Sequence, residues 1–191
     1  MEVEVLGWPP DGPQLRLDHE RFAYAGKFVM TDTGKAVGRE DGETVAAVSF
    51  SPDRTDPATL RIRYVTVRDD RRGEGLGPQL ADVLVTRAFD RGFDAAKIAV
   101  NNPYAYEAMY RAGFAFTREE TGMAELVLAR TGDDSAGSGH APQDEDGDED
   151  ATYEAGLRMF ARRDLGADER DFVAARLDGE PAARDGTPRD P

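Results

Sequence analysis

Residues 64–80 read Tyr-Val-Thr-Val-Arg-Asp-Asp-Arg-Arg-Gly-Glu-Gly-Leu-Gly-Pro-Gln-Leu, and this stretch decides the fold. It starts in an alternating, strand-like run, Thr59–Val67, and it ends in a pattern with helical spacing of the apolar residues. Three glycines lie between the two patterns, at Gly73, Gly75 and Gly77. Glycine allows tight turns, and the free N–H groups of a helix N-terminus bind phosphate. The stretch therefore predicts either a phosphate-binding loop or an ordinary glycine-rich turn between a strand and a helix.

Two other phosphate-binding motifs fit this stretch poorly. A Walker loop requires Gly-Lys-Ser/Thr, and no such triplet follows the glycines. A dinucleotide-binding loop requires a last glycine at the position of Pro78. It also requires an acidic residue at a strand end, whereas Asp94 is better placed just after the helix.

Residues 1–130 alternate between strand-like and helix-like patterns. Asp-Gly at positions 41 and 42 predicts a tight hairpin turn, because this dipeptide accepts positive φ angles. We expect strands over 1–6, 35–39, 44–50, 59–67, 96–100 and 122–130. We expect helices over about 18–25, from Leu76 to before Gly92, and from Pro103 to before Gly113. This order predicts a mixed α/β sheet flanked by helices.

The C-terminal third has a different composition. Residues 131–150 are rich in Gly, Ser and Asp and nearly devoid of apolar groups, which predicts a disordered linker. Two short amphipathic helices are expected within 151–178, followed by a disordered tail over 179–191. The chain thus divides into a main domain over 1–130, a linker and a helical appendage.

Composition excludes several classes of function. The absence of cysteine excludes disulfides, thiolate metal sites and a cysteine nucleophile, and two histidines make a histidine metal site implausible, so no metal is expected. No apolar run approaches ~18 residues and the start lacks the features of a signal peptide, so we expect a cytoplasmic protein away from membranes. No Lys/Arg stripe predicts nucleic-acid binding.

The net charge of −14 has two interpretations. It could serve a basic partner, or it could be an adaptation to concentrated salt. Of the 38 acidic residues 23 are Asp, only three of the 24 Lys and Arg residues are Lys, and the acid is spread along the chain. This distribution favours salt adaptation and an extreme halophile as the source.

Two motifs resemble those of the GNAT acetyltransferases. The central family motif is a hydrophobic strand, Arg/Gln-x-x-Gly-x-Gly/Ala and a helix, and here Arg72, Gly75 and Gly77 fill it. Residues 102–114, Asn-Pro-Tyr-Ala-Tyr-Glu-Ala-Met-Tyr-Arg-Ala-Gly-Phe, are similar to the second motif, in which Asn, Ala, an aromatic residue and Gly-Phe follow in order. The resemblance covers residues 60–116 firmly, extends over 1–130 and does not include 131–191.

The resemblance implies a GNAT fold, in which the sheet splays between strands 59–67 and 96–100, with a C-terminal helical appendage. It implies acetyl-CoA as co-substrate and an amine acceptor, either a small molecule or a protein N-terminus, and it leaves a homodimer open. The cofactor-binding residues that it implies are Val65 and Val67 on the strand, Arg72, Gly73, Glu74, Gly75, Leu76 and Gly77 in the loop, and Asn102 and Tyr110 in the second motif. Asn102 has a second interpretation as the cap of its helix.

The implied chemistry needs an oxyanion donor and an acid. The Val65 N–H would stabilise the oxyanion, and Tyr110 would protonate the leaving thiolate. Tyr110 stands one residue later than the family's tyrosine, and one residue on a helix is a rotation of about 100°. A Tyr110 packed beneath CoA is therefore an equal alternative, and Tyr106, one turn earlier, is a second candidate acid. The rival function is a non-catalytic acyl-CoA-binding or interaction module.

The salt interpretation predicts that the folded state needs molar salt. At 0.1 M salt the Debye length is about 10 Å and carboxylates repel one another, whereas at 1 M it is about 3 Å. Urea denaturation, which adds no ions, should give a higher free energy of unfolding at 2 M than at 0.1 M KCl. Equal stability at the two concentrations would contradict the salt interpretation and favour a basic substrate.

Overall fold

The computed structural model describes residues 1–132 and 149–179. Residues 133–148 and 180–191, which hold most of the expected linker and the expected tail, lie outside the described residues. The described chain divides into two compact units, Met1–Lys97 and Ile98–Pro191, and each unit is described by itself. No described helix is long and apolar enough to cross a membrane.

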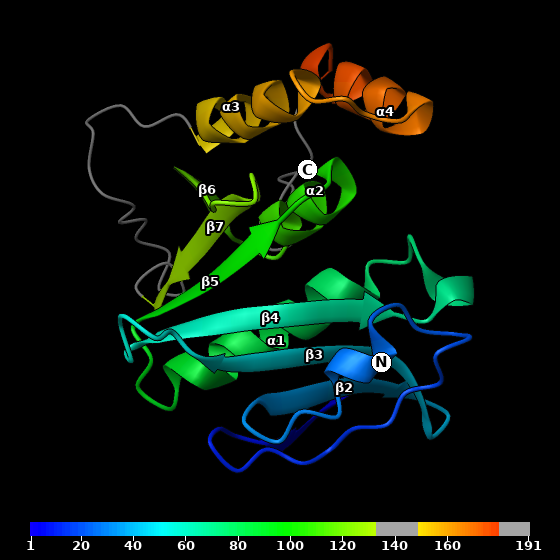
Figure 1. The fold of residues 1–191 in the computed structure, drawn as a ribbon, viewed down its shortest axis with the longest axis vertical. Coiled ribbons are helices and arrows are strands. Elements are labelled where there is room, and N and C mark those ends of the chain that lie inside the picture. The colour runs from blue at the N-terminus through cyan, green and yellow to red at the C-terminus, as the bar shows by residue number, and fades with distance from the viewer. Residues whose placement is uncertain (133–148, 180–191) are drawn as a thin grey trace, which may run out of the picture. The chain divides into compact units, whose positions relative to one another are not determined.

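Seven strands form one mixed sheet with the order β1-β2-β3-β4-β5-β7-β6 (Figure 1). The strands are β1 (Glu2–Gly7), β2 (Gly34–Glu40), β3 (Glu43–Pro52), β4 (Thr59–Val67), β5 (Ala95–Val100), β6 (Ala115–Glu120) and β7 (Leu126–Thr131). The helices are α1 (Leu76–Phe89), α2 (Pro103–Arg111), α3 (Glu149–Ala161) and α4 (Ala167–Leu177), with 3-10 turns η1 (Ala25–Lys27) and η2 (Asp69–Arg71). The predicted mixed sheet with flanking helices and a C-terminal helical appendage is confirmed.

In the first unit, β1 to β4 form an antiparallel meander. The predicted hairpin turn forms between β2 and β3, where Asp41 and Gly42 have φ angles of 49° and 81°. Direct pairing puts Val48 beside Val65 and Ala46 beside Val67, so these four side chains share one face of the sheet. Helix α1 packs on that face, and its buried side chains include Leu80, Leu84 and Ala88.

The opposite face is covered by residues 8–33, which we call the lobe. The helix expected over 18–25 does not form; instead Asp18 begins a turn, its carbonyl accepting hydrogen bonds from the N–H groups of Arg21 and Phe22. Apolar side chains hold the lobe in place, because Phe28 packs in a fully buried cluster with Val37 and Ala47. Tertiary anchoring of a few large side chains replaces a local helix here.

A buried lysine fixes the end of the lobe to β2. The Lys35 ammonium donates hydrogen bonds of 2.6–2.7 Å to the Met30 and Thr33 carbonyls and to the Thr33 hydroxyl. The side chain is fully buried, and desolvation lowers the pKa of Lys35. Satisfying the ammonium in this way offsets part of its burial cost.

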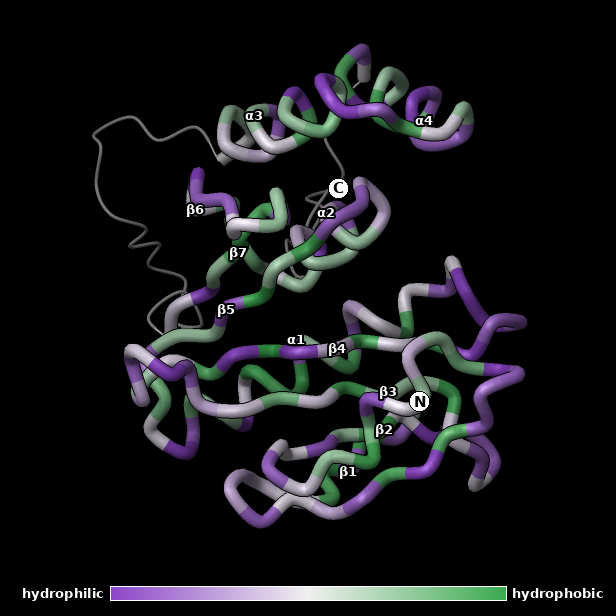
Figure 2. Tube along the Cα trace, in the orientation of Figure 1, coloured by the Kyte–Doolittle hydropathy of each residue, from purple (hydrophilic) through white to green (hydrophobic). Residues whose placement is uncertain are grey.

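In the second unit, α3 packs on α2 and β6, and α4 packs on α2 and α3. Strand β6 was missed by the sequence analysis, because only the first two of its six residues carry buried or half-buried apolar side chains and its end is exposed. Helix α3 buries Tyr153, Leu157 and Phe160, whereas α4 mixes hydrophilic and hydrophobic residues and buries Val173 (Figure 2). The expected amphipathic helices are therefore part of the core of this unit.

Gly156 of α3 lies against the Tyr106 ring, where a Cβ would come within 2.2 Å of the phenol oxygen. Gly156→Ala should therefore lower the free energy of unfolding by about 1–3 kcal/mol, although alanine favours helix by about 1 kcal/mol. Gly122→Ala is the matched control, because a Cβ there meets nothing within 4 Å. Urea unfolding of both variants makes the comparison, and equal stability would contradict this packing.

Candidate functional site

The glycine loop leaves the start of α1 open. Gly73 and Gly75 have φ angles of 85° and 77°, in the left-handed region that glycine adopts without strain. A Cβ on either residue would meet nothing within 4 Å, so the space beside the loop backbone is free. Gly75 is the N-cap of α1, and no side chain caps the helix. The first N–H groups of α1 thus form an anion-binding site of the kind that holds phosphate.

Gly77 has a different role. A Cβ on it would lie 3.4 Å from a methyl group of Val67 and 3.6 Å from one of Val65. The first turn of α1 therefore packs against the end of β4, at a distance that still leaves room for a methyl group. The two valines and the glycine loop, all expected to bind the cofactor, therefore lie together in the first unit.

Ion pairs fix the loop to the hairpin of β2 and β3. Arg71 contacts Glu40 at 2.8 Å and Glu74 at 2.7 Å, and its hydrogen bond lowers the pKa of Glu74. Arg68 contacts Glu43 at 2.8 Å. These pairs tie Arg68, just before the 3-10 turn, and Arg71, its last residue, to the strands beside it.

Arg72 is the outermost arginine of the loop. It pairs with Asp69, and 58% of its side chain is exposed. An exposed ion pair contributes little to stability, so Arg72 can exchange its carboxylate for another anion at small cost. Backbone N–H groups and one exchangeable arginine are the means this loop offers for holding a phosphate.

In the second unit, Asn102 caps α2. Its side-chain oxygen accepts a hydrogen bond of 2.8 Å from the Ala105 N–H, and its amide nitrogen donates to the Asn101 side chain. The sequence left open whether Asn102 caps its helix, and the structure shows that it does.

Tyr106 and Tyr110, both on α2, are almost completely buried, at 0% and 4% exposure. The Tyr106 hydroxyl donates to the Tyr153 carbonyl at 3.1 Å, and burial raises its pKa. The ring of Tyr110 lies 4.4 Å from that of Tyr153. These two phenols of α2 therefore contact α3, and the Tyr106 hydroxyl is bound to the backbone of α3.

Sequence reasoning missed a buried carboxylate between them. Glu107 is 5% exposed and accepts hydrogen bonds from Arg176, Arg111 and the Tyr153 hydroxyl. Burial and the Glu107 charge raise the pKa of Tyr153. The spacing of Glu107 and Arg111 was a local signal, but the pairing with Arg176 joins residues 69 positions apart. In the described chain, no three His, Cys, Asp or Glu residues form a group that could hold a metal.

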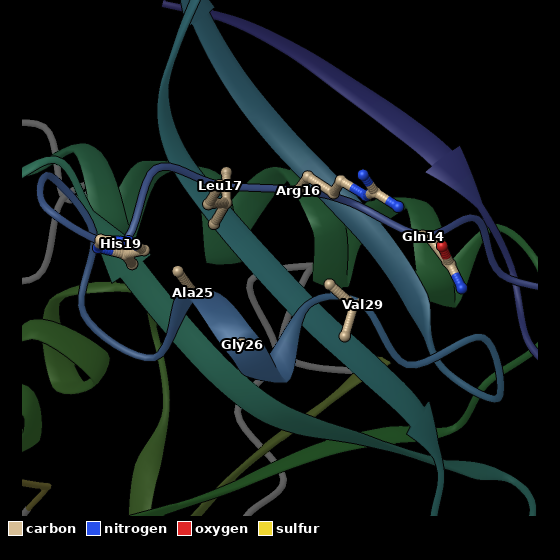
Figure 3. Close-up of a pocket in the computed structure, with 7 residues that line it drawn as sticks. All are labelled: Gln14, Arg16, Leu17, His19, Ala25, Gly26 and Val29. Carbon is tan, nitrogen blue, oxygen red and sulfur yellow. The ribbon is translucent and has the colours of Figure 1, made fainter.

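The lobe carries a hollow of about 540 Å³ that the sequence did not indicate. Figure 3 shows its lining on two runs of the lobe, residues 14–19 and 25–29, which face each other. The lining residues are Gln14, Arg16, Leu17, His19, Ala25, Gly26 and Val29. Its size is that of a small-molecule site.

The profile of the Acetyltransferase (GNAT) family matches residues 4–114, more than half of the chain. The chain belongs to this family. A search of the curated proteins finds no match.

Three solved structures resemble this chain at low sequence identity. A putative acetyltransferase from Salmonella typhimurium, solved with acetyl-CoA, is 19% identical with a TM-score of 0.48, over 59% of this chain and 70% of that one. An IAA acetyltransferase from Bacillus cereus is 15% identical with a TM-score of 0.49, over 68% and 98%. A ribosomal-protein-alanine N-acetyltransferase from Brucella melitensis is 18% identical with a TM-score of 0.43, over 52% and 68%.

Gly75→Ala should weaken acetyl-CoA binding at least about tenfold, because its Cβ occupies the open space beside the loop N–H groups. The substitution also adds about 1–2 kcal/mol of left-handed backbone strain. Gly42→Ala is the matched control, since Gly42 has a φ of 81° and equally open surroundings in the β2–β3 turn. Titration calorimetry measures both affinities, and equal values for the two variants would remove the phosphate-loop assignment.

Proposed function

We propose that this protein transfers the acetyl group of acetyl-CoA to an amine. The observation that carries the proposal is the uncapped start of α1 behind two left-handed glycines, directly after β4, in a chain of the acetyltransferase family. Backbone N–H groups and a positive helix end favour a pyrophosphate over a neutral ligand. Residues 1–130 supply all the groups that the proposal uses.

The proposed cofactor contacts follow the order of the chain. The backbone of Val65 and Val67 hydrogen-bonds the pantetheine arm, and the N–H groups of residues 72–77 bind the pyrophosphate. Arg72 exchanges Asp69 for a phosphate oxygen. Asn102, which caps α2, contacts the CoA arm through its remaining hydrogen-bonding capacity.

The reaction is a direct attack within a ternary complex. The lone pair of a neutral amine forms the new C–N bond at the thioester carbonyl, and the Val65 N–H stabilises the oxyanion. The C–S bond then breaks, the nitrogen loses a proton to water, and the CoA thiolate gains one. The products are an N-acetyl amine and free CoA. No enzyme nucleophile takes part, which agrees with a chain that has no cysteine.

Tyr110 is the proposed donor of the thiolate's proton. The other candidate, Tyr106, already donates its hydroxyl to the backbone of α3, and its raised pKa makes it a weaker acid. A free phenol has a pKa of about 10 and an alkyl thiol one of about 8.5, so the two groups are close enough for a phenol to protonate a thiolate.

The rival function is an acyl-CoA-binding module without chemistry. The burial of both tyrosines favours it, since a phenol enclosed by α3 has little access to a ligand. Incubation with acetyl-CoA and a panel of amines, read by release of free thiol, separates the two functions. Binding of acetyl-CoA without thiol release for any amine would establish the rival.

Tyr110→Phe should lower kcat by about 10²-fold and leave the affinity for acetyl-CoA unchanged, because only the phenol oxygen is removed. Tyr106→Phe is the matched variant, one helical turn earlier. A loss in Tyr106→Phe alone would exchange the two roles. If neither variant loses activity, water protonates the thiolate and both tyrosines serve packing.

A further inference from the structure

The arginines around the glycine loop are all engaged by carboxylates. Residues 68–77 contain three arginines, no lysine and three acidic residues. Two of the arginines are bound to the β2–β3 hairpin by ion pairs of 2.8 Å, and the third, Arg72, pairs with Asp69. A phosphate that reaches the start of α1 therefore meets arginines that already hold a carboxylate.

Asp69 is fixed in place, whereas Arg72 is free to turn away from it. Asp69 begins η2, and its backbone N–H donates a hydrogen bond of 2.9 Å to the Arg21 carbonyl of the lobe. Arg72 follows η2 in an extended conformation and leads into Gly73. The two side chains are 52% and 58% exposed. Opening such a solvated pair costs little, and the carboxylate stays beside the loop when the arginine leaves.

Two further carboxylates of the loop carry charge at neutral pH. The hydrogen bond from Arg68 lowers the pKa of Asp70, and the hydrogen bond from Arg71 lowers the pKa of Glu74. An anion at the start of α1 thus lies close in the chain to three carboxylates, in a protein with a net charge of −14. Backbone N–H groups attract the anion at contact, while the surrounding charge repels it.

We propose that Asp69 competes with the cofactor for Arg72, and that acetyl-CoA consequently binds more tightly as the salt concentration rises. When a phosphate oxygen takes Arg72, Asp69 keeps its charge beside the new anion. Salt screens the resulting repulsion, because the Debye length falls from about 10 Å at 0.1 M to about 3 Å at 1 M. This inference rests on the proposed binding of acetyl-CoA and adds a regulation of that site.

The sign of this salt dependence separates the inference from its alternative. A phosphate site built on unpaired Lys and Arg releases counterions when it fills, so its affinity falls as salt rises. Here each arginine of the loop has a carboxylate as its counterion, and the hydrogen bonds of the α1 N–H groups act over contact distances. Screening therefore removes more repulsion than attraction.

Titration calorimetry of the full-length protein with acetyl-CoA, at KCl concentrations from 0.1 to 1 M, measures this dependence. The dissociation constant should fall about tenfold over the range, because the repulsion between a phosphate and a nearby carboxylate in water is worth about that factor. Far-UV circular dichroism at each concentration reports the folded fraction, to which the affinities are normalised.

Asp69→Asn should lower the dissociation constant about tenfold at 0.1 M KCl and by much less at 1 M, because the competing charge is gone. Asp90→Asn is the matched control. It makes the same change of net charge at the exposed C-cap of the same helix, roughly 20 Å from the loop. Partial unfolding at low salt weakens binding in both variants alike, so their difference isolates the charge of Asp69.

A variant of the arginine tests the competition itself. In an Arg72→Gln background, Asp69→Asn should improve the affinity by less than it does alone, since the arginine for which the two anions compete is absent. An equal improvement in both backgrounds would show that Asp69 acts only through its field, and the competition would be wrong.

Two other results overturn the inference. An affinity of the unchanged protein that falls as KCl rises shows a site of unpaired cations. Equal affinities of Asp69→Asn and Asp90→Asn show that the loop carboxylate has no part in binding. If acetyl-CoA binds at no KCl concentration to any of these proteins, the proposed function itself fails, which is a different result from binding with the opposite salt dependence.

Discussion

The close approach of α1 to β4 at Gly77 is the contact on which the candidate cofactor site depends. The first turn of the helix packs against Val65 and Val67 there, so the uncapped N–H groups start directly beyond the strand. The left-handed residues Gly73 and Gly75 make that turn possible without blocking its open side. A side chain larger than a methyl group at Gly77 would push the helix away from the strand, and a side chain at Gly75 would fill the space for the anion. The three glycines thus share one motif but answer different physical demands.

Charge around the loop is arranged to hold the backbone rather than to attract phosphate by itself. Arg68 and Arg71 are bound to carboxylates of the β2–β3 hairpin and its surroundings, and Arg72 has an exposed pair. Backbone N–H groups lose little strength when salt screens distant charges, since they act at contact. A loop of this kind suits a chain with a net charge of −14, in which a long-range cationic field is absent.

The second unit is held by aromatic packing around a buried charge. Tyr106 and Tyr110 of α2 meet Tyr153 of α3, and Glu107 joins α2 to Arg176 of α4. A buried carboxylate costs several kcal/mol unless it is paired, and here three donors from three helices surround it. The helical appendage therefore belongs to the core of this unit. It encloses Tyr106 and Tyr110, the two candidates for the acid that protonates the thiolate.

The sequence by itself determined the strands and helices around residues 35–113, because periodicity, the Asp-Gly turn and helix-boundary glycines are local signals. It also determined the loop motif, since left-handed glycines before a helix need no distant partner. Strand β6 and the structure of the lobe were decided only by tertiary contacts: β6 has little local pattern, and Phe28 and Lys35 anchor the lobe where a helix was expected. The same holds for the surroundings of Tyr106, Glu107 and Tyr110. A helix shows which residues share its face, but the partner that covers this face comes from residues 153–176, more than forty positions away, and only folding brings it there.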